Sequence, residues 1–183
     1  MAVTWFSADQ HFGHANVIGF CDRPFANVWE MDKALISAWN SVVGDSDTVY
    51  HLGDFSLSGN LNQVADWFWE LNGKIHLLTY PWHHDGRWMR RLGKTFFPPH
   101  DKVKFDAPIV VLEHDPAITL CHYPMASWEK SHYNSWHLFG HTHDRYRPDN
   151  LSMDVGVDAA YRLFGEYRPF AMEEVEEIMK GRA

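Results

Sequence analysis

The chain has 183 residues and a formal net charge of −8, and 45% of its residues are hydrophobic and 15% aromatic. This length and composition predict one domain, spanning residues 1–183, that buries a sizeable core and is not disordered. No run of about 18 apolar residues is present, so we expect no transmembrane helix and no membrane partner. The acidic balance disfavours a broad surface for duplex nucleic acid, because phosphate contacts need clustered Lys and Arg.

The two cysteines, Cys21 and Cys121, are too few for a disulfide scaffold, whereas thirteen histidines are present. The first ten residues lack the basic start and long apolar stretch of a signal peptide. We therefore expect free thiols and a cytoplasmic protein. If the chain holds metal, the expected ligands are imidazole and carboxylate groups rather than thiolates.

The first part of the chain alternates strand and helix patterns. Short apolar segments predict strands at residues 2–7, 48–52 and 74–79. Apolar residues at three- and four-residue steps predict helices at residues 28–43, which Asn27 would cap, and at residues 60–71. We expect a Gly-bearing loop from Asn16 to Pro24. This alternation is typical of a parallel α/β unit.

The second part of the chain has a different pattern. Residues 109–112 and 117–121 predict a hairpin, residues 136–139 and 151–155 two more strands, and residues 173–179 a short C-terminal helix. The chain as a whole is therefore expected to be of mixed α/β (α+β) class. Six of the sixteen basic residues lie between Arg87 and Lys104, and this run is either a solvated face or a patch for phosphate.

Polar side chains of the kinds that bind metals follow five of the predicted strands. They are Asp9 and His11, then Asp54, then His83, His84 and Asp85, then His122, and finally His141 and His143. Because ligands of open α/β sheets bind outside the carboxyl ends of the strands, five such loops can converge on one site. In extended backbone, residues two apart point to the same side, so each Asp-x-His or His-x-His pair could offer two ligands. Gly53 and Gly140 precede ligands and would allow tight turns.

In this order the motifs resemble those of the calcineurin-like metallophosphoesterases. The family's D-x-H, G-D, G-N-H-D, lone H and G-H-x-H motifs are matched by Asp9-Gln10-His11, Gly53-Asp54, Trp82-His83-His84-Asp85, His122 and Gly140-His141-Thr142-His143. The flanks of these motifs, at residues 11–14, 20–25, 50–55 and 155–158, resemble a compact bacterial and phage branch. The resemblance implies a β-sandwich of two mixed sheets flanked by helices on both outer faces (αββα).

The resemblance also implies two divalent metal ions and a role for each motif. Asp9, His11 and His143 would bind the first metal, His122 and His141 with His83 the second, and Asp54 would bridge them. Mixed imidazole and carboxylate ligands suit Mn, Fe, Zn or Ni, and family habit favours Mn or Fe. Asp9 and Asp54 would be catalytic through the metals, and His84 would stand beside the phosphate to stabilise or protonate the departing oxygen.

The third motif departs from the family pattern at two positions. His83 stands where the family has Asn, and an imidazole is a good replacement ligand. Trp82 stands where the family has Gly, and if that position needs a positive φ, the loop is strained or rebuilt.

Three further residues are candidates for binding substrate. His14 and Asn16 follow the first ligand pair closely enough to reach it. The planar guanidinium of Arg23 could pair with a phosphate oxygen, or it could form a salt bridge that orders its loop.

The function expected from the resemblance is hydrolysis of phosphate esters, most naturally small phosphodiesters or nucleotides, by attack of a metal-bound hydroxide. Two enzyme alternatives stay open, a nuclease acting on single strands and a phosphomonoesterase, although nucleic acid is not the favoured partner. The non-enzyme alternative is a metal-poor interaction scaffold of the same fold. Against the scaffold, every charged ligand position of the family is filled. The sequence does not determine the oligomeric state.

Overall fold

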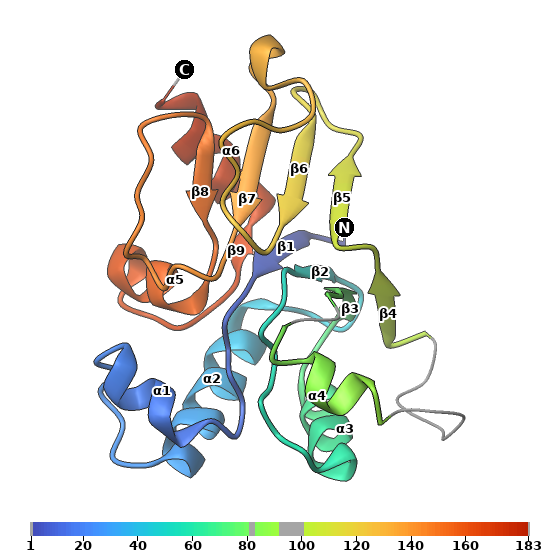
Figure 1. Cartoon of the computed structure of the whole chain (residues 1–183), viewed down its shortest axis with the longest axis vertical. Coiled ribbons are helices and arrows are strands. Elements are labelled where there is room, and N and C mark those ends of the chain that lie inside the picture. Colours follow the sequence, from blue (N-terminus) through green and yellow to red (C-terminus); the bar gives the residue numbers. More distant parts are fainter. Residues whose placement is uncertain (1, 81–82, 92–100, 183) are drawn as a thin grey trace.

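A computed structural model of the protein describes residues 2–80, 83–91 and 101–182 (Figure 1). One sheet contains β1 (Thr4–Ser7), β2 (Thr48–His51), β3 (Lys74–Leu78), β4 (Val103–Asp106) and β9 (Phe170–Ala171), in the order β4-β3-β2-β1-β9. The other contains β5 (Ile109–Leu112), β6 (Ile118–Cys121), β7 (Trp136–Phe139) and β8 (Ser152–Asp154), in the order β5-β6-β7-β8. Strands β1 to β4 are parallel, as are β6 to β8, whereas β9 and β5 are antiparallel to their neighbours. The expected mixed α/β class is confirmed.

Six helices accompany the sheets within the described residues. They are α1 (Ala15–Phe20), α2 (Val28–Val42), α3 (Leu61–Glu70), α4 (Gly86–Met89), α5 (Val157–Phe164) and α6 (Met172–Lys180). A single 3₁₀ turn, Ser131–Tyr133, precedes β7. Helices α1 to α4 gather on the side of the five-stranded sheet that faces away from β5 to β8 (Figure 1).

Two hydrophobic clusters hold these layers together. The first packs the sheet residues Trp5, Val49 and Ile75 against α2 and α3, which contribute Leu35 and Phe68 among others. The second joins the two sheets to each other and to α5 and α6, and its members include Phe6, Leu120, Leu138, Ala160 and Val175. Consecutive residues of a strand point to opposite faces, which is why Trp5 and Phe6 lie in different clusters. The parallel strands β6 and β7 are buried on both faces, whereas the parallel strand β4 is partly exposed.

Of the three helices that the sequence predicted, α2 and α3 have a side-chain cap, whereas the N-cap side chain of α6 makes no hydrogen bond. The Asn27 side chain accepts a hydrogen bond from the Glu30 N–H at 3.0 Å, and α2 begins where it was expected. The Asn60 side chain likewise caps α3. By contrast, α1, α4 and α5 have no side-chain hydrogen bond at the N-cap, and the sequence did not predict them. The segment from Asn16 to Pro24, which was expected to be a loop, is instead helical as far as Phe20, and the two short strands β4 and β9 were also missed.

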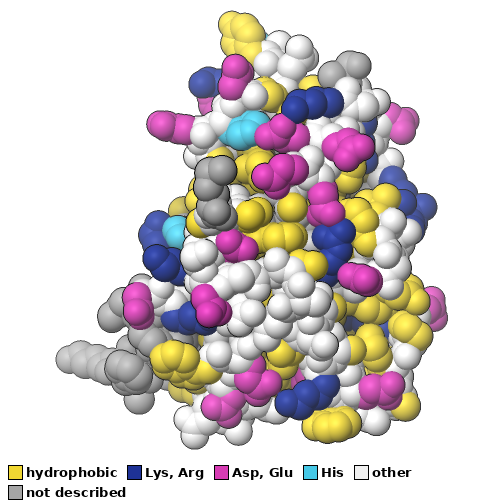
Figure 2. All heavy atoms as spheres, turned by 180° about the vertical axis from the view of Figure 1, so that it is seen from behind, with side chains coloured by type: hydrophobic (Ala, Val, Ile, Leu, Met, Phe, Trp, Pro, Cys, Tyr) yellow, Lys and Arg dark blue, Asp and Glu magenta, His cyan; other side chains and the backbone are white. Residues whose placement is uncertain are grey.

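On one face of the molecule, side chains of both charge signs are interspersed (Figure 2). In the basic run after Arg87, Arg91 donates to the Gly59 carbonyl and Lys104 pairs with Asp106 at 2.9 Å, while Lys94 lies outside the described residues. No helix of the described chain has the length and apolar character needed to cross a membrane.

Candidate metal centre

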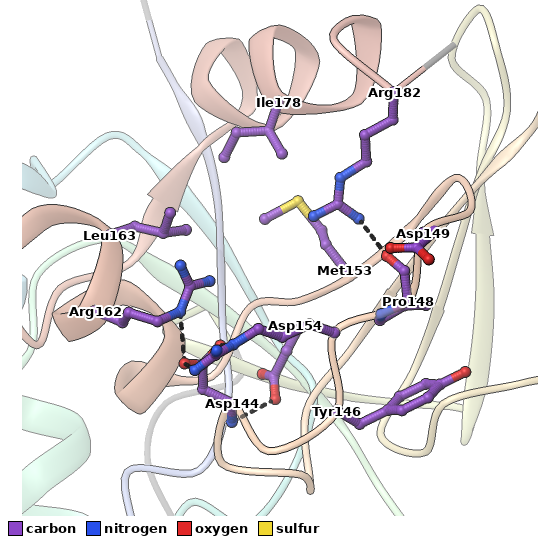
Figure 3. Close-up of a pocket in the computed structure, with 11 residues that line it drawn as sticks. Asp144, Tyr146, Pro148, Asp149, Met153, Asp154, Arg162, Leu163, Ile178 and Arg182 are labelled. Atoms are coloured by element: carbon purple, nitrogen blue, oxygen red, sulfur yellow. Dashed lines mark hydrogen bonds and ion pairs between the residues drawn. The ribbon is translucent and has the colours of Figure 1, made fainter.

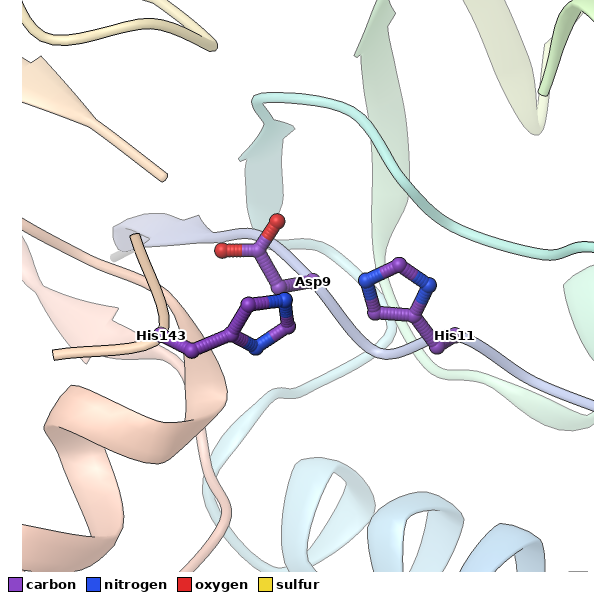
Figure 4. Close-up of side chains that lie close together, drawn as sticks. All are labelled: Asp9, His11 and His143. Atoms are coloured by element: carbon purple, nitrogen blue, oxygen red, sulfur yellow. The ribbon is translucent and has the colours of Figure 1, made fainter. Parts of the chain in front are cut away.

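The carboxyl ends of the parallel strands of both sheets meet, and the residues that follow them form one cluster. Asp9 and His11 come after β1, and His143 comes after β7. One ligand atom from each of these three side chains lies within 4.8 Å of the others. Figure 4 shows the Asp9 carboxylate and the two imidazoles converging from the two chain segments. The structure thus brings together the three residues expected to hold the first metal.

A second group of three adjoins the first. Asp54 follows β2, His122 follows β6, His141 follows β7, and their ligand atoms also lie within 4.8 Å of one another. Asp54 Oδ2 is 3.7 Å from His11 Nε2 and 3.5 Å from His122 Nε2. One carboxylate oxygen therefore lies between an imidazole of each group, where a ligand shared by two ions would stand.

His83 belongs to the same cluster. Its ring is buried, its centroid lies 4.1 Å from that of His122, and its ligand atoms group with those of Asp54 and Asp85. The oxygens of Asp85 are already occupied, because they accept from the Phe55 and Ser56 N–H groups and from Trp88 Nε1. Asp85 therefore ties the loop after β3 to the loop after β2, and His83 and His84 are the residues of this motif that lie at the centre. The expectation about Trp82 falls outside the described residues.

The donor set fits metal ions because its buried polar atoms lack partners. Among the described residues, Asp9 Oδ1, His122 Nδ1 and both ring nitrogens of His11 and His83 are buried without a hydrogen bond. Buried polar atoms are nearly always paired, so six such atoms in one cluster point to a ligand. Burial raises the pKa of the Asp9 carboxyl to about 7, which shows how poorly protein alone stabilises its charge. Imidazole and carboxylate together suit Mn, Fe, Zn or Ni.

The backbone at the ligands corrects one prediction. The pairs Asp9 and His11, and His141 and His143, were expected to point the same way because the chain is extended. Instead all four have positive φ, at 63°, 54°, 69° and 48°, and Asp54 has 55°. Left-handed backbone is uncommon for residues other than Gly, and such strain gathers at functional sites. The ligand side chains therefore point toward one another because the backbone turns tightly, and not because they alternate along an extended strand.

The two glycines serve the site in different ways. Gly53 has a φ of +117°, and a Cβ there would lie 2.6 Å from His83 Nδ1. A Cβ on Gly140 would lie 2.6 Å from the Ala8 Cβ and 2.9 Å from Asp9 Oδ2. Gly53 therefore permits the expected turn, whereas Gly140 permits the close approach of the loop after β7 to Asp9.

Hydrogen bonds behind the first group orient its ligands. Asp9 Oδ2 accepts from the His141 N–H at 2.8 Å, which leaves Oδ1 facing the cluster. His143 Nδ1 is 2.7 Å from Asp158 Oδ2, so its Nε2 is the nitrogen left for a metal. Asp154 holds the loop between the two histidines by accepting from Thr142 Oγ1 at 2.6 Å. Such carboxylates set the tautomer and direction of a ligating imidazole.

Sequence reasoning did not identify Asp154 or Asp158 as part of the site. The only signal was that Asp158 ends a flank, at residues 155–158, that resembles the metallophosphoesterases. Both carboxylates reach the ligand loop only in the folded chain, so no short sequence motif connects them to His143.

Arg23 does not face substrate, and that prediction is wrong. Its side chain is buried, with Nε and Nη2 donating to Asp158 at 2.9 and 2.8 Å. Nη1 and Nη2 also donate to the carbonyls of Gln10 and Asp9, at 3.0 and 2.7 Å. The alternative reading, a salt bridge that orders a loop, describes what Arg23 does.

The open side of the cluster is lined by imidazoles. The His84 side chain is 46% exposed, its Nε2 lies 4.0 Å from Asp54 Oδ2, and its N–H donates to Asp54 Oδ1 at 3.3 Å. The half-buried His14 ring lies 5.5 Å from that of His11 and 6.0 Å from that of His84. Both could therefore reach a molecule bound at the cluster. Asn16 is exposed in the first turn of α1, two positions beyond His14.

Comparison with known proteins finds relatives without an assigned activity. The chain is 32% identical to the uncharacterized protein MJ1445 of Methanocaldococcus jannaschii, over 98% of this chain and 93% of that protein. It is 31% identical to the gene 66 protein of Mycobacterium phage L5, over 89% and 90% of the two chains. The gene 66 protein of Mycobacterium phage D29 is 28% identical over 98% of this chain and 96% of the phage protein.

Among solved structures, a protein of unknown function from Aquifex aeolicus, AQ665, superposes with a TM-score of 0.69 at 21% identity, covering 97% of this chain and 100% of that one. This likeness shows a shared fold. No family model matches the chain. The full-length similarity at more than 30% identity nevertheless establishes kinship, and the chain belongs to the family of MJ1445 and the phage L5 gene 66 protein.

Proposed function

We propose that the protein is a dinuclear-metal-dependent phosphoesterase with the calcineurin-like β-sandwich (αββα). The observation that carries this proposal is the place of Asp54, whose Oδ2 lies between His11 of one three-residue group and His122 of the other. Two adjoining groups that share one carboxylate can hold a pair of ions. The unpaired nitrogens and oxygens of the same residues support a pair over a hydrogen-bonded polar core.

The residues around this centre would have two roles, binding the ions and orienting the residues that bind them. Asp9, His11 and His143 would hold one ion, His122, His141 and His83 the other, and Asp54 both. Two divalent ions, when bound, lower the pKa of a coordinated water and neutralise phosphoryl oxygens. Asp158 orients His143, and Arg23 fixes Asp158 together with the backbone of Asp9.

His84 is suited to handling the proton of the leaving group. It lies on the open side of the cluster and is half-exposed, so its ring can approach a bound ester. Its backbone N–H is tied to Asp54 Oδ1, which keeps the ring beside the bridging carboxylate. A positioned imidazole that donates a proton to a poor leaving group accelerates the reaction by roughly 10²–10⁴-fold.

The charges around the centre favour diesters over monoesters. A monoester dianion needs more neutralising charge than a diester monoanion. Arg23, the arginine expected to supply it, is enclosed by Asp158 and two carbonyls. We therefore favour small phosphodiesters or nucleotides as substrates, with single-stranded nucleic acid and phosphomonoesters as the alternative classes.

A metal-resolved substrate panel tests the proposal. Protein loaded with Mn, Fe, Zn or Ni would be assayed on phosphodiesters, phosphomonoesters and single-stranded oligonucleotides, with metal content measured in parallel. We expect two ions per chain and turnover that His122→Ala abolishes. His76→Ala is the matched control, because His76 pairs with Asp106 in β4 and is not part of the cluster. Protein that binds fewer than two ions and turns over no ester would instead be the interaction scaffold.

A further inference from the structure

A cavity of about 380 Å³ lies next to the loop that carries His141 and His143. Asp144 directly follows that loop, Asp154 holds it, and both contribute to the lining. The remaining walls come from the segment after Asp144, from β8, from α5, and from α6 with the chain end beyond it (Figure 3). Its volume is within the range of sites that hold small organic ligands.

The guanidinium groups of Arg162 and Arg182 face this cavity, and Arg147 also contributes to its lining. Arg162 donates through Nε to Asp144 Oδ2 at 2.6 Å, and within the described chain its two terminal nitrogens have no partner. Arg182 donates through Nη1 to the carbonyls of Pro148, Asn150 and Ser152, and no described carboxylate lies within ion-pair distance of it. Figure 3 shows both guanidinium groups pointing into the same space.

The acidic residues of the lining are committed elsewhere. The Asp144 carboxylate accepts from both Arg147 and Arg162, so one negative charge serves two guanidinium groups. Asp154 accepts from Thr142 Oγ1 and from the N–H groups of Asp144 and Gly156. Asp149 is exposed to solvent and attracts Arg182 electrostatically, although it lies beyond ion-pair distance. Among the described residues, an anion entering the cavity would meet the terminal N–H groups of Arg162, which have no hydrogen-bond partner.

The rest of the lining is apolar or aromatic. Met153, Leu163 and Ile178 supply the apolar lining, and the Tyr146 ring is 49% exposed. Guanidinium forks match the geometry of phosphate oxygens, and aromatic and aliphatic groups suit a flat ring. We propose that this cavity binds a phosphate monoester that carries a ring, with a mononucleotide as the ligand class. The proposal concerns binding alone and does not depend on catalysis at the metal cluster.

Calorimetric titration of the full-length, metal-loaded protein with adenosine monophosphate and with inorganic phosphate tests this site. Leu163→Glu places a carboxylate at the 42% exposed wall position, and Leu163→Gln is its neutral match in size. We expect a saturable nucleotide site, separate from any site at the metal cluster, that is about tenfold weaker in Leu163→Glu and in Arg182→Gln, because each change opposes or removes a charged contact. Leu163→Gln should stay within about twofold of the native affinity, and phosphate should bind more weakly than the nucleotide.

His122→Ala separates this site from the metal cluster. Nucleotide binding that survives His122→Ala and fails in Leu163→Glu supports the cavity, whether or not any esterase activity is found. Binding that His122→Ala abolishes, or that Leu163→Glu leaves unchanged, would place the nucleotide elsewhere and overturn the proposal. Equal affinity for phosphate and nucleotide would overturn the role of the apolar lining.

Discussion

Arg23 and Asp158 form a buried two-bond ion pair between residues 135 positions apart, with Nε–Oδ1 and Nη2–Oδ2 distances of 2.9 and 2.8 Å. Asp158 Oδ2 also lies 2.7 Å from His143 Nδ1. The pair connects the segment between α1 and α2, the start of α5 and the loop after β7. Arg23 therefore positions two candidate ligands, His143 through Asp158 and Asp9 through its carbonyl.

Arg23→Ala should weaken binding at the first metal group by about 10–100-fold, which is the usual effect of removing a group that orients a ligand. It also leaves Asp158 buried without its cation. Chelator competition on the purified protein measures the affinity. Arg168→Ala, which breaks a bidentate pair with Glu174 away from the cluster, should leave metal affinity unchanged. An equal loss in both variants would point to general destabilisation.

His83→Ala should weaken only the second metal, because His83 contacts the His122 side of the cluster. His83→Asn should recover part of the activity by supplying the ligand that the metallophosphoesterase motif has at this position. Metal stoichiometry and ester turnover are the measurements. Full activity with two ions in His83→Ala would show that this imidazole is not a ligand.

His84→Ala should reduce kcat/KM by roughly 10²–10⁴-fold on alkyl or nucleoside esters and far less on nitrophenyl esters. An alkoxide needs a proton to leave, whereas a nitrophenolate does not. Metal content should be unchanged. If both ester types lose activity equally, His84 acts by charge or position rather than as a proton donor.

Gly140→Ala should destabilise the protein by about 1–3 kcal/mol and weaken the first metal group. The added Cβ would lie 2.6 Å from the Ala8 Cβ and 2.9 Å from Asp9 Oδ2, so one side of the site must shift. Gly19→Ala is the matched control, because a Cβ there meets no atom within 4 Å. Thermal melting and chelator competition compare the two variants, and similar behaviour of both would contradict the close approach.

Asp32 should make stability depend on pH between about 4 and 6. Its carboxylate accepts from the Gly13 N–H, and burial raises its pKa from the ordinary 3.8 to about 6. In this window the folded protein keeps a proton that the unfolded chain releases, so the contribution of Asp32 to stability falls as pH rises, by about 2 kcal/mol. Asp32→Asn cannot titrate. Denaturant unfolding of both proteins at pH 4, 5, 6 and 7 should therefore show native stability declining relative to the variant, and parallel curves would refute the shift.

The sequence by itself determined the features that depend on residues close together in the chain. Asn27 marked a helix start through its cap, and apolar periodicity marked the helix that Asn60 caps in the structure. Short apolar runs marked strands whose carboxyl ends carry every candidate ligand. Because parallel strands end at a common edge, the sequence predicted that the motif loops converge on one site, whereas the grouping of Asp9, His11 and His143 came from the resemblance to the metallophosphoesterases.

Only the tertiary structure decided how those side chains are held. The backbone at Asp9 and His143 has a positive φ, and only contacts from the surrounding structure can hold it in that strained conformation. The two-residue spacing of the ligands in the sequence does not encode these contacts. Arg23 and Asp158 pair with each other although they are 135 positions apart in the sequence. Such a contact follows from tertiary packing rather than from local propensity. Helices α1, α4 and α5, which lack side-chain caps, likewise form without a start signal in the sequence.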